Sequence, residues 1–357
     1  VSRGGVTEPF LAEHGSPERA VRPGSDVSVY AFNQTLLQNL AALTRPEIAW
    51  GLIYALAFTY ILVIGPGHYF WAKKMNYRTA IALFAAIVVV YGLCFAWAGR
   101  RGIGETQRAH SLSIAYPLEG DRYDVMQWNN AFVTRGALYK LTHAAPANFY
   151  SVGAPQTEQN IAGRIQNGRD GFFAMDLPLY SSRPFMHRAV MQGAVTAVTP
   201  KEWQTDGSGA LKGFAFQPPA GFPTEIHAIH ARANGKIHPV KLNKEGLWQM
   251  EAGKSEQEFF ANLRTDFSAM VPFGRKQDDE KRDEETWLSQ KMDDLMAHAL
   301  GGAERLQHFI PGRPIAPDQL QLFIFARVPE GFRLQGGDFK VERGWVLYVR
   351  NVFKTDL

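Results

Sequence analysis

Two long stretches without formal charge, separated by only six residues, constrain this 357-residue chain more than any other feature. Residues 48–72 contain no Asp, Glu, Lys or Arg, and His68 is their only ionisable side chain. Residues 79–99 also carry no formal charge. Because about 20 apolar residues cross the hydrocarbon core of a bilayer as a helix, the sequence predicts a transmembrane helical hairpin over residues 48–99.

The turn between the two stretches, residues 73–78, carries three positive charges and no acid. Concentrated positive charge favours the cytoplasmic side of a membrane. Four arginines flank the opposite ends of the stretches, so charge alone leaves an inverted orientation open: Arg45, Arg100, Arg101 and Arg108. Since two spans return the chain to the side from which it came, we expect both termini to lie outside the cytoplasm.

The first stretch contains Gly65-Pro66-Gly67 near its end. Proline removes a backbone donor and kinks a helix, so we expect the helix to break there and His68 to Trp71 to lie in the interface. Two interpretations of His68 remain, a hydrogen-bonded interface residue or a ligand in a cofactor pocket. The first is the commoner use of a single histidine.

Outside the two apolar stretches the sequence resembles that of an ordinary soluble domain. Even with both stretches included, the whole chain is 20% charged and its mean hydropathy is −0.20. Its 38 basic and 34 acidic residues give a net charge of +4, but no basic cluster accompanies that excess. Nucleic acid is therefore not expected as a partner, because affinity for phosphate needs concentrated charge. The single cysteine, Cys94, lies in the second apolar stretch and excludes an intrachain disulfide.

Short apolar or alternating runs separated by turn signals predict a β-rich domain over residues 104–357. Many strands with regular turns favour an antiparallel β-sandwich. The fold class is therefore mainly β, with a transmembrane helical hairpin and one inserted amphipathic helix. The turn signals are LEGD (118–121), QNGRDG (166–171), TDGSG (205–209), QPPAGFP (217–223) and NKEG (243–246).

The clearest local unit is a β-hairpin over residues 225–242, centred on Asn234-Gly235. This dipeptide is the strongest short-range hairpin signal. It predicts three cross-strand pairs: Ala233 with Lys236, Ala231 with His238, and Ile229 with Val240.

Three histidines of this hairpin resemble a metal-ligand cluster. Strand side chains alternate between faces, so the predicted pairing puts His227 and His238 on one face and His230 on the other. Because ligands from opposite faces cannot share one zinc ion, no metal site is expected here.

Two amphipathic helices are expected outside the hairpin. Residues 1–32 form an irregular tail, and residues 33–47 contain a short helix with Leu36, Leu37, Leu40 and Leu43 at helical spacing. The second helix, residues 278–300, is an insertion between strands. Its apolar face is formed by Leu288, Met292, Leu295, Met296 and Ala299.

The run YILVIGPGHYFWAKKMNYRTAIALFAAIVVVYGLCFAWAGRRG, residues 60–102, resembles a group of uncharacterised bacterial two-helix membrane proteins. Their pattern is an apolar helix ending in a Gly-Pro segment, a short basic turn, a second apolar helix and a C-terminal extracytoplasmic β-sandwich-like domain. The resemblance implies an inner-membrane location with both flanks outside the cytoplasm, and it implies no catalytic residues. Those proteins carry a signal sequence and a further N-terminal domain before the first helix. We expect neither in the sequence from Val1 onward, which leaves a fragment, a processed product or a start at a non-Met codon open.

Common catalytic motifs are lacking: the sequence has no Walker A loop, no dinucleotide-binding glycine pattern, no His-Glu-x-x-His and no Gly-x-Ser-x-Gly. We therefore expect no catalytic, cofactor-binding or metal residues. The sequence favours a non-enzymatic interaction or scaffold protein, an accessory subunit of a larger membrane complex, with the lipid bilayer and other subunits as partners. A membrane-bound hydrolase remains an alternative, and so does an envelope glycan-binding module that uses Trp128, Trp203, Trp248 or Trp345.

Overall fold

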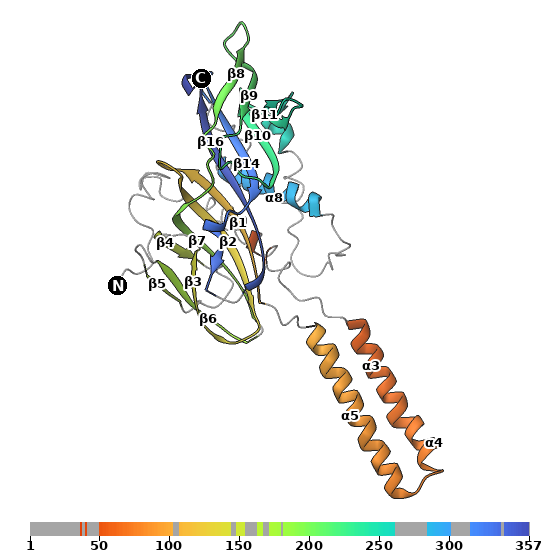
Figure 1. Cartoon of the computed structure of the whole chain (residues 1–357). Helices are drawn as coiled ribbons and strands as arrows, with labels where there is room; N and C mark the ends of the chain where they lie inside the picture. Colours follow the sequence, from red (N-terminus) through yellow and green to blue (C-terminus); the bar gives the residue numbers. More distant parts are fainter. Residues whose placement is uncertain are drawn as a thin grey trace, which may run out of the picture.

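The computed structural model contains a helical hairpin and a β-domain (Figure 1). It describes residues 36, 37, 40, 50–102, 107–143, 148–153, 163–166, 171–179, 181–260, 284–300, 315–336 and 339–356. The expected irregular tail, residues 1–32, lies outside the described residues.

The first arm of the hairpin consists of α3 (Trp50–Leu62), the π-helical turn η1 (Val63–Gly67) and α4 (His68–Ala72), and the second arm is α5 (Tyr77–Gly102). Two 22-residue segments, Gly51–Ala72 and Tyr77–Ala98, are long and apolar enough to cross a membrane, with mean hydropathies of 1.5 and 2.4. The prediction of two apolar helices joined by a short turn is confirmed.

The expected break at Pro66 does not occur. The chain passes Pro66 in η1 and continues as α4 without leaving the helical region, since Gly67 has φ −60° and ψ −55°. Proline cannot donate the usual backbone hydrogen bond, and a π-turn shifts the pairing by one residue. The wider turn therefore accommodates the proline inside a continuous helical arm.

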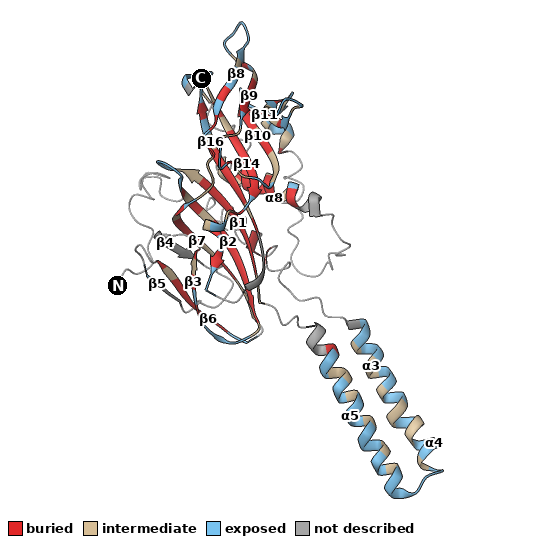
Figure 2. Cartoon of the chain, in the orientation of Figure 1, coloured by how far each residue is buried: buried red, intermediate tan, exposed pale blue. Residues whose placement is uncertain are grey.

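The two arms contact each other through a few aromatic side chains. The ring of Tyr60 lies 5.2 Å from that of Tyr91 and 6.4 Å from that of Phe95, centroid to centroid. Elsewhere the described helix surface is half-buried or exposed, except at Ala98. Figure 2 shows the contrast between this uncovered hairpin and the buried centre of the β-domain.

One large sheet organises the β-domain. Its strand order is β4-β7-β2-β1-β16-β14-β10-β11-β12-β9-β8, and β13 pairs with β11 off this path. The strands are β1 (Gln107–Pro117), β2 (Arg122–Val133), β4 (Asn148–Gly153), β7 (Ser181–Gln192), β8 (Thr199–Thr205), β9 (Leu211–Gln217), β10 (Ile226–Ala233), β11 (Lys236–Leu242), β12 (Trp248–Met250), β13 (Lys254–Ser255), β14 (Gln319–Arg327) and β16 (Phe339–Phe353).

The expectation of a purely antiparallel arrangement is wrong at the centre of this sheet. β1 and β16 run parallel, with Leu112 opposite Trp345 and Ile114 opposite Leu347. The other strand pairs of the sheet are antiparallel. Parallel neighbours need a long connection, and here more than 220 residues separate the two strands. The sheet is therefore mixed. β16 lies between β1, the first strand of the domain, and β14, which comes late in the chain.

The sheet curls on itself. The evidence is that the edge strand β8 contacts η3 (Lys354–Asp356), which directly follows the central strand β16. Its inner face carries one apolar cluster, called here the inner core. Members from β2, β9, β10, β14 and β16 include Tyr123, Val125, Phe214, Phe216, Ile229, Ile324 and Tyr348.

A second cluster, the helix-side core, lies on the opposite face of the same strands. It combines Trp128, Phe323, Phe325 and Leu347 of the sheet with Leu288, Met292, Leu295 and Met296 of α8 (Glu284–Ala299). Leu36, Leu37 and Leu40 are helical and fully buried in this core. These residues of the short N-terminal helix therefore pack on the β-domain. The expected insertion over 278–300 is helical over α8, and residues 278–283 lie outside the described residues.

A small sheet of order β15-β3-β6-β5 covers one end of the domain. Its strands are β3 (Ala137–His143), β5 (Gly163–Gln166), β6 (Phe172–Leu177) and β15 (Leu334–Gln335). It packs on β2 and β7 through a third apolar cluster, the small-sheet core, formed by Ala131, Val133, Tyr139, Leu141, Phe173, Met175, Leu177, Phe185 and Leu334.

The predicted hairpin register is confirmed. β10 and β11 pair Ala233 with Lys236, Ala231 with His238, and Ile229 with Val240. Asn234 and Gly235 have φ values of +52° and +70°. Both lie in the left-handed region that a two-residue type I′ turn requires.

Candidate functional site

A band of buried polar side chains crosses β1, β2 and β7 on the inner face of the large sheet. Five of its members belong to these strands, and His143 joins them from the end of β3. Each residue is less than one tenth exposed. We call this set the polar band: Ser111, Ser113, Gln127, Asn129, His143 and His187.

Strand alternation places the band. Tyr123 and Val125 point into the inner core, and Ala131 and Val133 point into the small-sheet core from the same face of β2. Gln127 and Asn129 occupy the two positions between them. Because Gln127 pairs with both Ser113 and His187, and Asn129 pairs with Ser111, polar residues from three strands meet at this level. The band therefore separates two apolar cores.

The centre of the band is a direct contact between two imidazoles. The Nε2 atoms of His143 and His187 lie 2.8 Å apart. His143 Nδ1 lies 3.0 Å from the backbone oxygen of Phe332, in η2 (Glu330–Phe332). His187 Nδ1 lies 3.0 Å from Asn129 Nδ2.

These partners assign the protons of both rings. A carbonyl oxygen only accepts and an amide nitrogen only donates, so His143 donates from Nδ1 to Phe332 and His187 accepts at Nδ1 from Asn129. Nε2 of His187 then donates to Nε2 of His143. The chain of hydrogen bonds is complete with both imidazoles neutral.

Burial holds both rings in this neutral state. It lowers the pKa of His143 to about 4, against smaller opposing effects of the hydrogen bonds to Phe332 and Arg333. It also lowers the pKa of His187 well below its ordinary value, and the proximity of His143 contributes to this shift. The pair therefore carries no charge at neutral pH.

The chemistry available to the band is that of neutral donors and acceptors. All four ring nitrogens of the histidine pair have a hydrogen-bond partner, so neither ring has a lone pair ready to take a proton from a serine hydroxyl. Four further oxygens are buried without a hydrogen-bond partner among the described residues: Ser111 Oγ, Ser113 Oγ, Gln127 Oε1 and Asn129 Oδ1. Buried oxygens of this kind suit ordered water better than a charged substrate.

The hairpin histidines are arranged differently from the prediction. A bulge between Ile226 and Ala228 interrupts the pairing of β10 with β14. It turns His227 onto the helix-side face, where its ring lies 5.9 Å from that of Phe325 and its Nε2 lies 3.1 Å from Ser289 Oγ. His230 shares that face and packs on Phe259.

The predicted pairing of His227 with His238 on one face is therefore wrong. His238 lies opposite Ala231 of the inner core and contacts the backbone oxygen of Glu251 through Nδ1, at 2.9 Å. Across the part of the chain that the structure describes, no group of three or more His, Cys, Asp or Glu residues could hold a metal ion.

The tryptophans considered for glycan stacking lie in or against the cores. Trp128 is completely buried, and its ring lies 5.2 Å from that of His298 on α8. Trp203 and Trp248 pack against the inner core. Trp345 stacks on Phe325 at 5.4 Å. None of the four is fully exposed.

A second titratable group lies on α8. Lys291 donates to Asp294 across 2.7 Å in a buried ion pair. The neighbouring Asp293 has its pKa raised to about 7, first by burial and then by the charge of Asp294. Its carboxylate is therefore costly in the folded protein at neutral pH.

The polar band was not predicted from the sequence. A local signal for part of it exists in β2, where Gln127 and Asn129 interrupt the inward-facing series Tyr123, Val125, Ala131 and Val133. The contribution of His143 has no such signal, because it depends on the packing of β3 over β7.

No family model and no curated protein matches the chain. Among solved structures, a two-domain M1 zinc metallopeptidase bound to L-tryptophan aligns with 8% identity and a TM-score of 0.21 over 42% of this chain and 39% of its own. An M1 zinc metallopeptidase from Deinococcus radiodurans bound to a Tyr-Ser-Ala substrate aligns with 9% identity and a TM-score of 0.20 over 42% and 39%. The match thus spans about two fifths of each relative, and at these scores it carries no argument about function.

Proposed function

We propose that this chain is a non-enzymatic, membrane-anchored interaction protein, an accessory subunit of a larger complex in the bacterial inner membrane, with its β-domain outside the cytoplasm. The observation that carries the proposal is the helical hairpin. Its two arms contact each other, and none of the exposed apolar side chains on their outer surface is covered by another described part of the chain. A bilayer, together with the helices of other subunits, would cover that surface.

The charge distribution supports the orientation. Lys73 and Lys74 lie in the tight turn between the arms, Arg78 lies in the first turn of α5, and all three are exposed. Such a cluster is retained on the cytoplasmic side. The β-domain follows α5 and would lie on the opposite side of the membrane.

The surface of α5 supports association with other helices. Ala82, Ala85, Ala86 and Gly92 are all exposed, and a Cβ at Gly92 would meet nothing within 4 Å. Small residues let helix backbones approach closely in a membrane. The β-domain offers a second opportunity, because β4 and β8 are the edge strands of the large sheet and an edge strand can pair with another chain.

Site-specific photo-cross-linking in membranes tests the proposal. A photoreactive side chain replaces Ala85 or Gly92 on the small-residue side of α5. Val90 serves as the control, because it points about 140° away from Ala85 and about 160° away from Gly92 around the helix. A subunit contact predicts the same protein adduct from positions 85 and 92 and a weaker one from position 90. Absence of an adduct at all three positions, with a monodisperse monomer in mild detergent, would overturn the subunit proposal.

A further inference from the structure

Chain connectivity identifies which end of the β-domain lies next to the hairpin. β1 begins at Gln107, only five residues after α5 ends at Gly102. An extended chain covers at most about 3.6 Å per residue. The start of β1 therefore lies within about 18 Å of the end of α5, whatever path residues 103–106 take.

Strand register identifies what else lies at that end. Arg108 of β1 pairs with Phe132 near the end of β2, and Phe132 pairs with Ser182 near the start of β7. The β2–β3 turn lies just after Phe132 in the chain, and the β6–β7 turn lies just before Ser182. Both turns therefore belong to the membrane-proximal end of the domain (Figure 1).

Two large apolar side chains lie at or beside these turns, one from the second residue of β3 and one from the β6–β7 turn. Leu138 is 70% exposed and Leu179 is 62% exposed, the two highest values among the exposed large hydrophobic residues described beyond α5. The turns are adjacent, since a Cβ at Gly136 would lie 3.0 Å from the backbone nitrogen of Leu179. Arg135, in the first turn, is exposed. We call Arg135, Leu138 and Leu179 the membrane-proximal tip.

We propose that the membrane-proximal tip rests on the bilayer, with Leu138 and Leu179 in the interfacial layer and Arg135 among the phosphates. The inference depends on the proposed function, because it needs the hairpin to be inserted. Exposed leucines beside a basic side chain match the chemistry of that layer, which combines acyl chains and anionic headgroups. The tether through α5 keeps the tip at a high effective concentration beside the surface, so two leucines suffice.

This contact would fix the angle of the β-domain above the membrane. A short connection alone leaves the domain free to pivot about residue 102, whereas a second point of attachment removes that freedom. The edge strands β4 and β8 would then face partners from a defined direction.

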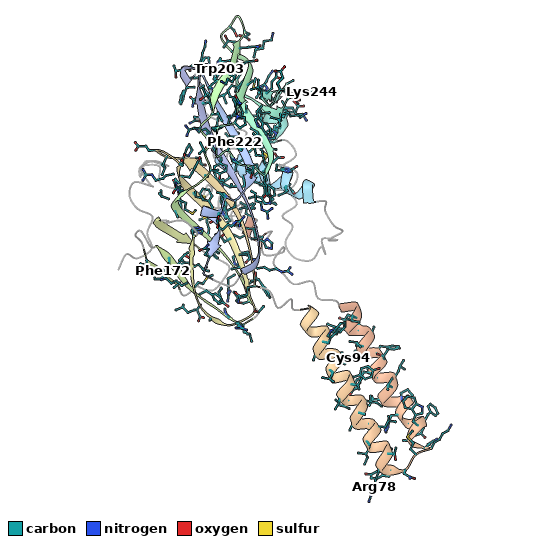
Figure 3. All side chains as sticks on the ribbon, viewed as in Figure 1. Arg78, Cys94, Phe172, Trp203, Phe222 and Lys244 are labelled. Carbon is teal, nitrogen blue, oxygen red and sulfur yellow. The ribbon has the colours of Figure 1, made fainter. Side chains whose placement is uncertain are left out.

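Fluorescence quenching in liposomes tests the contact. Cys94 is replaced by Ala, and single cysteines are introduced by Leu138→Cys, Leu179→Cys, Leu242→Cys and Leu93→Cys and labelled with an environment-sensitive dye. Leu242 is the matched control, because it is 57% exposed but lies next to the turn that contains Lys244, at the end far from Arg78 and the hairpin (Figure 3). Leu93 is 67% exposed on α5 and reports insertion of the hairpin.

We expect lipids spin-labelled at the headgroup to quench the dyes at positions 138 and 179 several-fold more than the dye at 242. If the dye at 93 is quenched by acyl-chain spin labels while 138 and 179 behave like 242, the tip contact is wrong and the membrane anchor stands. If the dye at 93 is not quenched either, the anchor itself is wrong.

Discussion

His143 and His187 approach each other through their Nε2 atoms, at 2.8 Å, inside the buried polar band. The arrangement requires one ring to donate and the other to accept, so only the doubly neutral state preserves it. Protonation of either ring would place two donors against each other. The contact therefore links the packing of the small sheet on β2 and β7 to the protonation of two imidazoles.

Protonation of His143 should reduce the stability of the β-domain at pH values above the range in which ordinary carboxylates titrate. The pKa of His143 is about 4 in the folded protein and about 6.5 in an unfolded chain, so the unfolded state binds the proton first as the pH falls. The stability is complete above pH 6.5 and is lost progressively down to about pH 4, by roughly 3 kcal/mol for this residue. Urea unfolding between pH 7.5 and 4.5 would measure the loss.

The variant His143→Gln should reduce that pH dependence, even though it also lowers stability at pH 7.5. His238→Gln is the control, because His238 is half-buried on β11 opposite Ala231 and lies outside the polar band. An unchanged slope in His143→Gln would argue against the buried pair as the source of acid sensitivity.

Titration of Asp293 should change the stability of the β-domain in the opposite direction to that of His143. Burial and Asp294 raise its pKa to about 7 in the folded protein, from an ordinary 3.8. A raised carboxyl pKa favours folding below pH 3.8, and this contribution is lost as the pH rises toward 7. At pH 8 the variant Asp293→Asn should therefore be more stable than the parent, by roughly 1–3 kcal/mol.

Thermal unfolding at pH 8 and pH 5 would test this. The gain from Asp293→Asn should shrink at pH 5, where the parent carboxyl is already protonated in the folded state. Asp206→Asn provides the comparison, because Asp206 is fully exposed in a turn, where Ser208 Oγ and backbone N–H groups hold the pKa of its carboxyl below the ordinary value. Equal gains at both pH values in Asp293→Asn would contradict the assignment.

Local features of the chain were predictable, because neighbouring residues determine them. The Asn234-Gly235 turn fixes the register of β10 and β11 through two left-handed residues, and the uncharged stretches define the hairpin helices. The parallel pairing of β1 with β16 was not predictable, since it joins strands from opposite ends of the domain. No turn signal encodes such a contact.

The positions of individual histidine side chains were likewise not predictable from the sequence. Alternation alone assigned His227 to the face of His238, but the bulge after Ile226 reverses it. A bulge adds one residue to a strand and so reverses the facing of the residues on one side of it. The contact between His143 and His187 likewise depends on how the small sheet lies over the large one, which strand patterns do not specify.

The hairpin turn offers a conformational test. Gly235 has φ +70°, and a Cβ there would meet nothing within 4 Å, so Gly235→Ala has only a backbone cost. That cost should be about 1–2 kcal/mol. The matched control is Gly207→Ala, at an equally open position for which no left-handed φ is found. Chemical unfolding of both variants should show a loss for Gly235→Ala alone, and equal losses would show that the turn conformation is not the cause.

His68 joins the two arms of the helical hairpin. Its Nε2 donates to the backbone oxygen of Ala80 at 3.1 Å, and its ring lies edge-on to Phe84 at 5.6 Å. The contact favours the hydrogen-bonded role of His68 over a ligand role, because it joins α4 to α5 directly below the π-turn. Removing it by His68→Leu should weaken the pairing of the arms by about 0.5–1.5 kcal/mol.

Detergent-induced separation of the arms, followed by energy transfer between labels near Trp50 and Trp97, would measure this change. His68→Gln retains a donor and should recover part of the loss. Phe58→Leu is the outward-facing control, since Phe58 is 65% exposed on α3 and its replacement should leave the midpoint unchanged. If His68→Leu behaves like Phe58→Leu, the bond to Ala80 does not hold the arms together, and the π-turn with the Tyr60 contacts must account for their pairing.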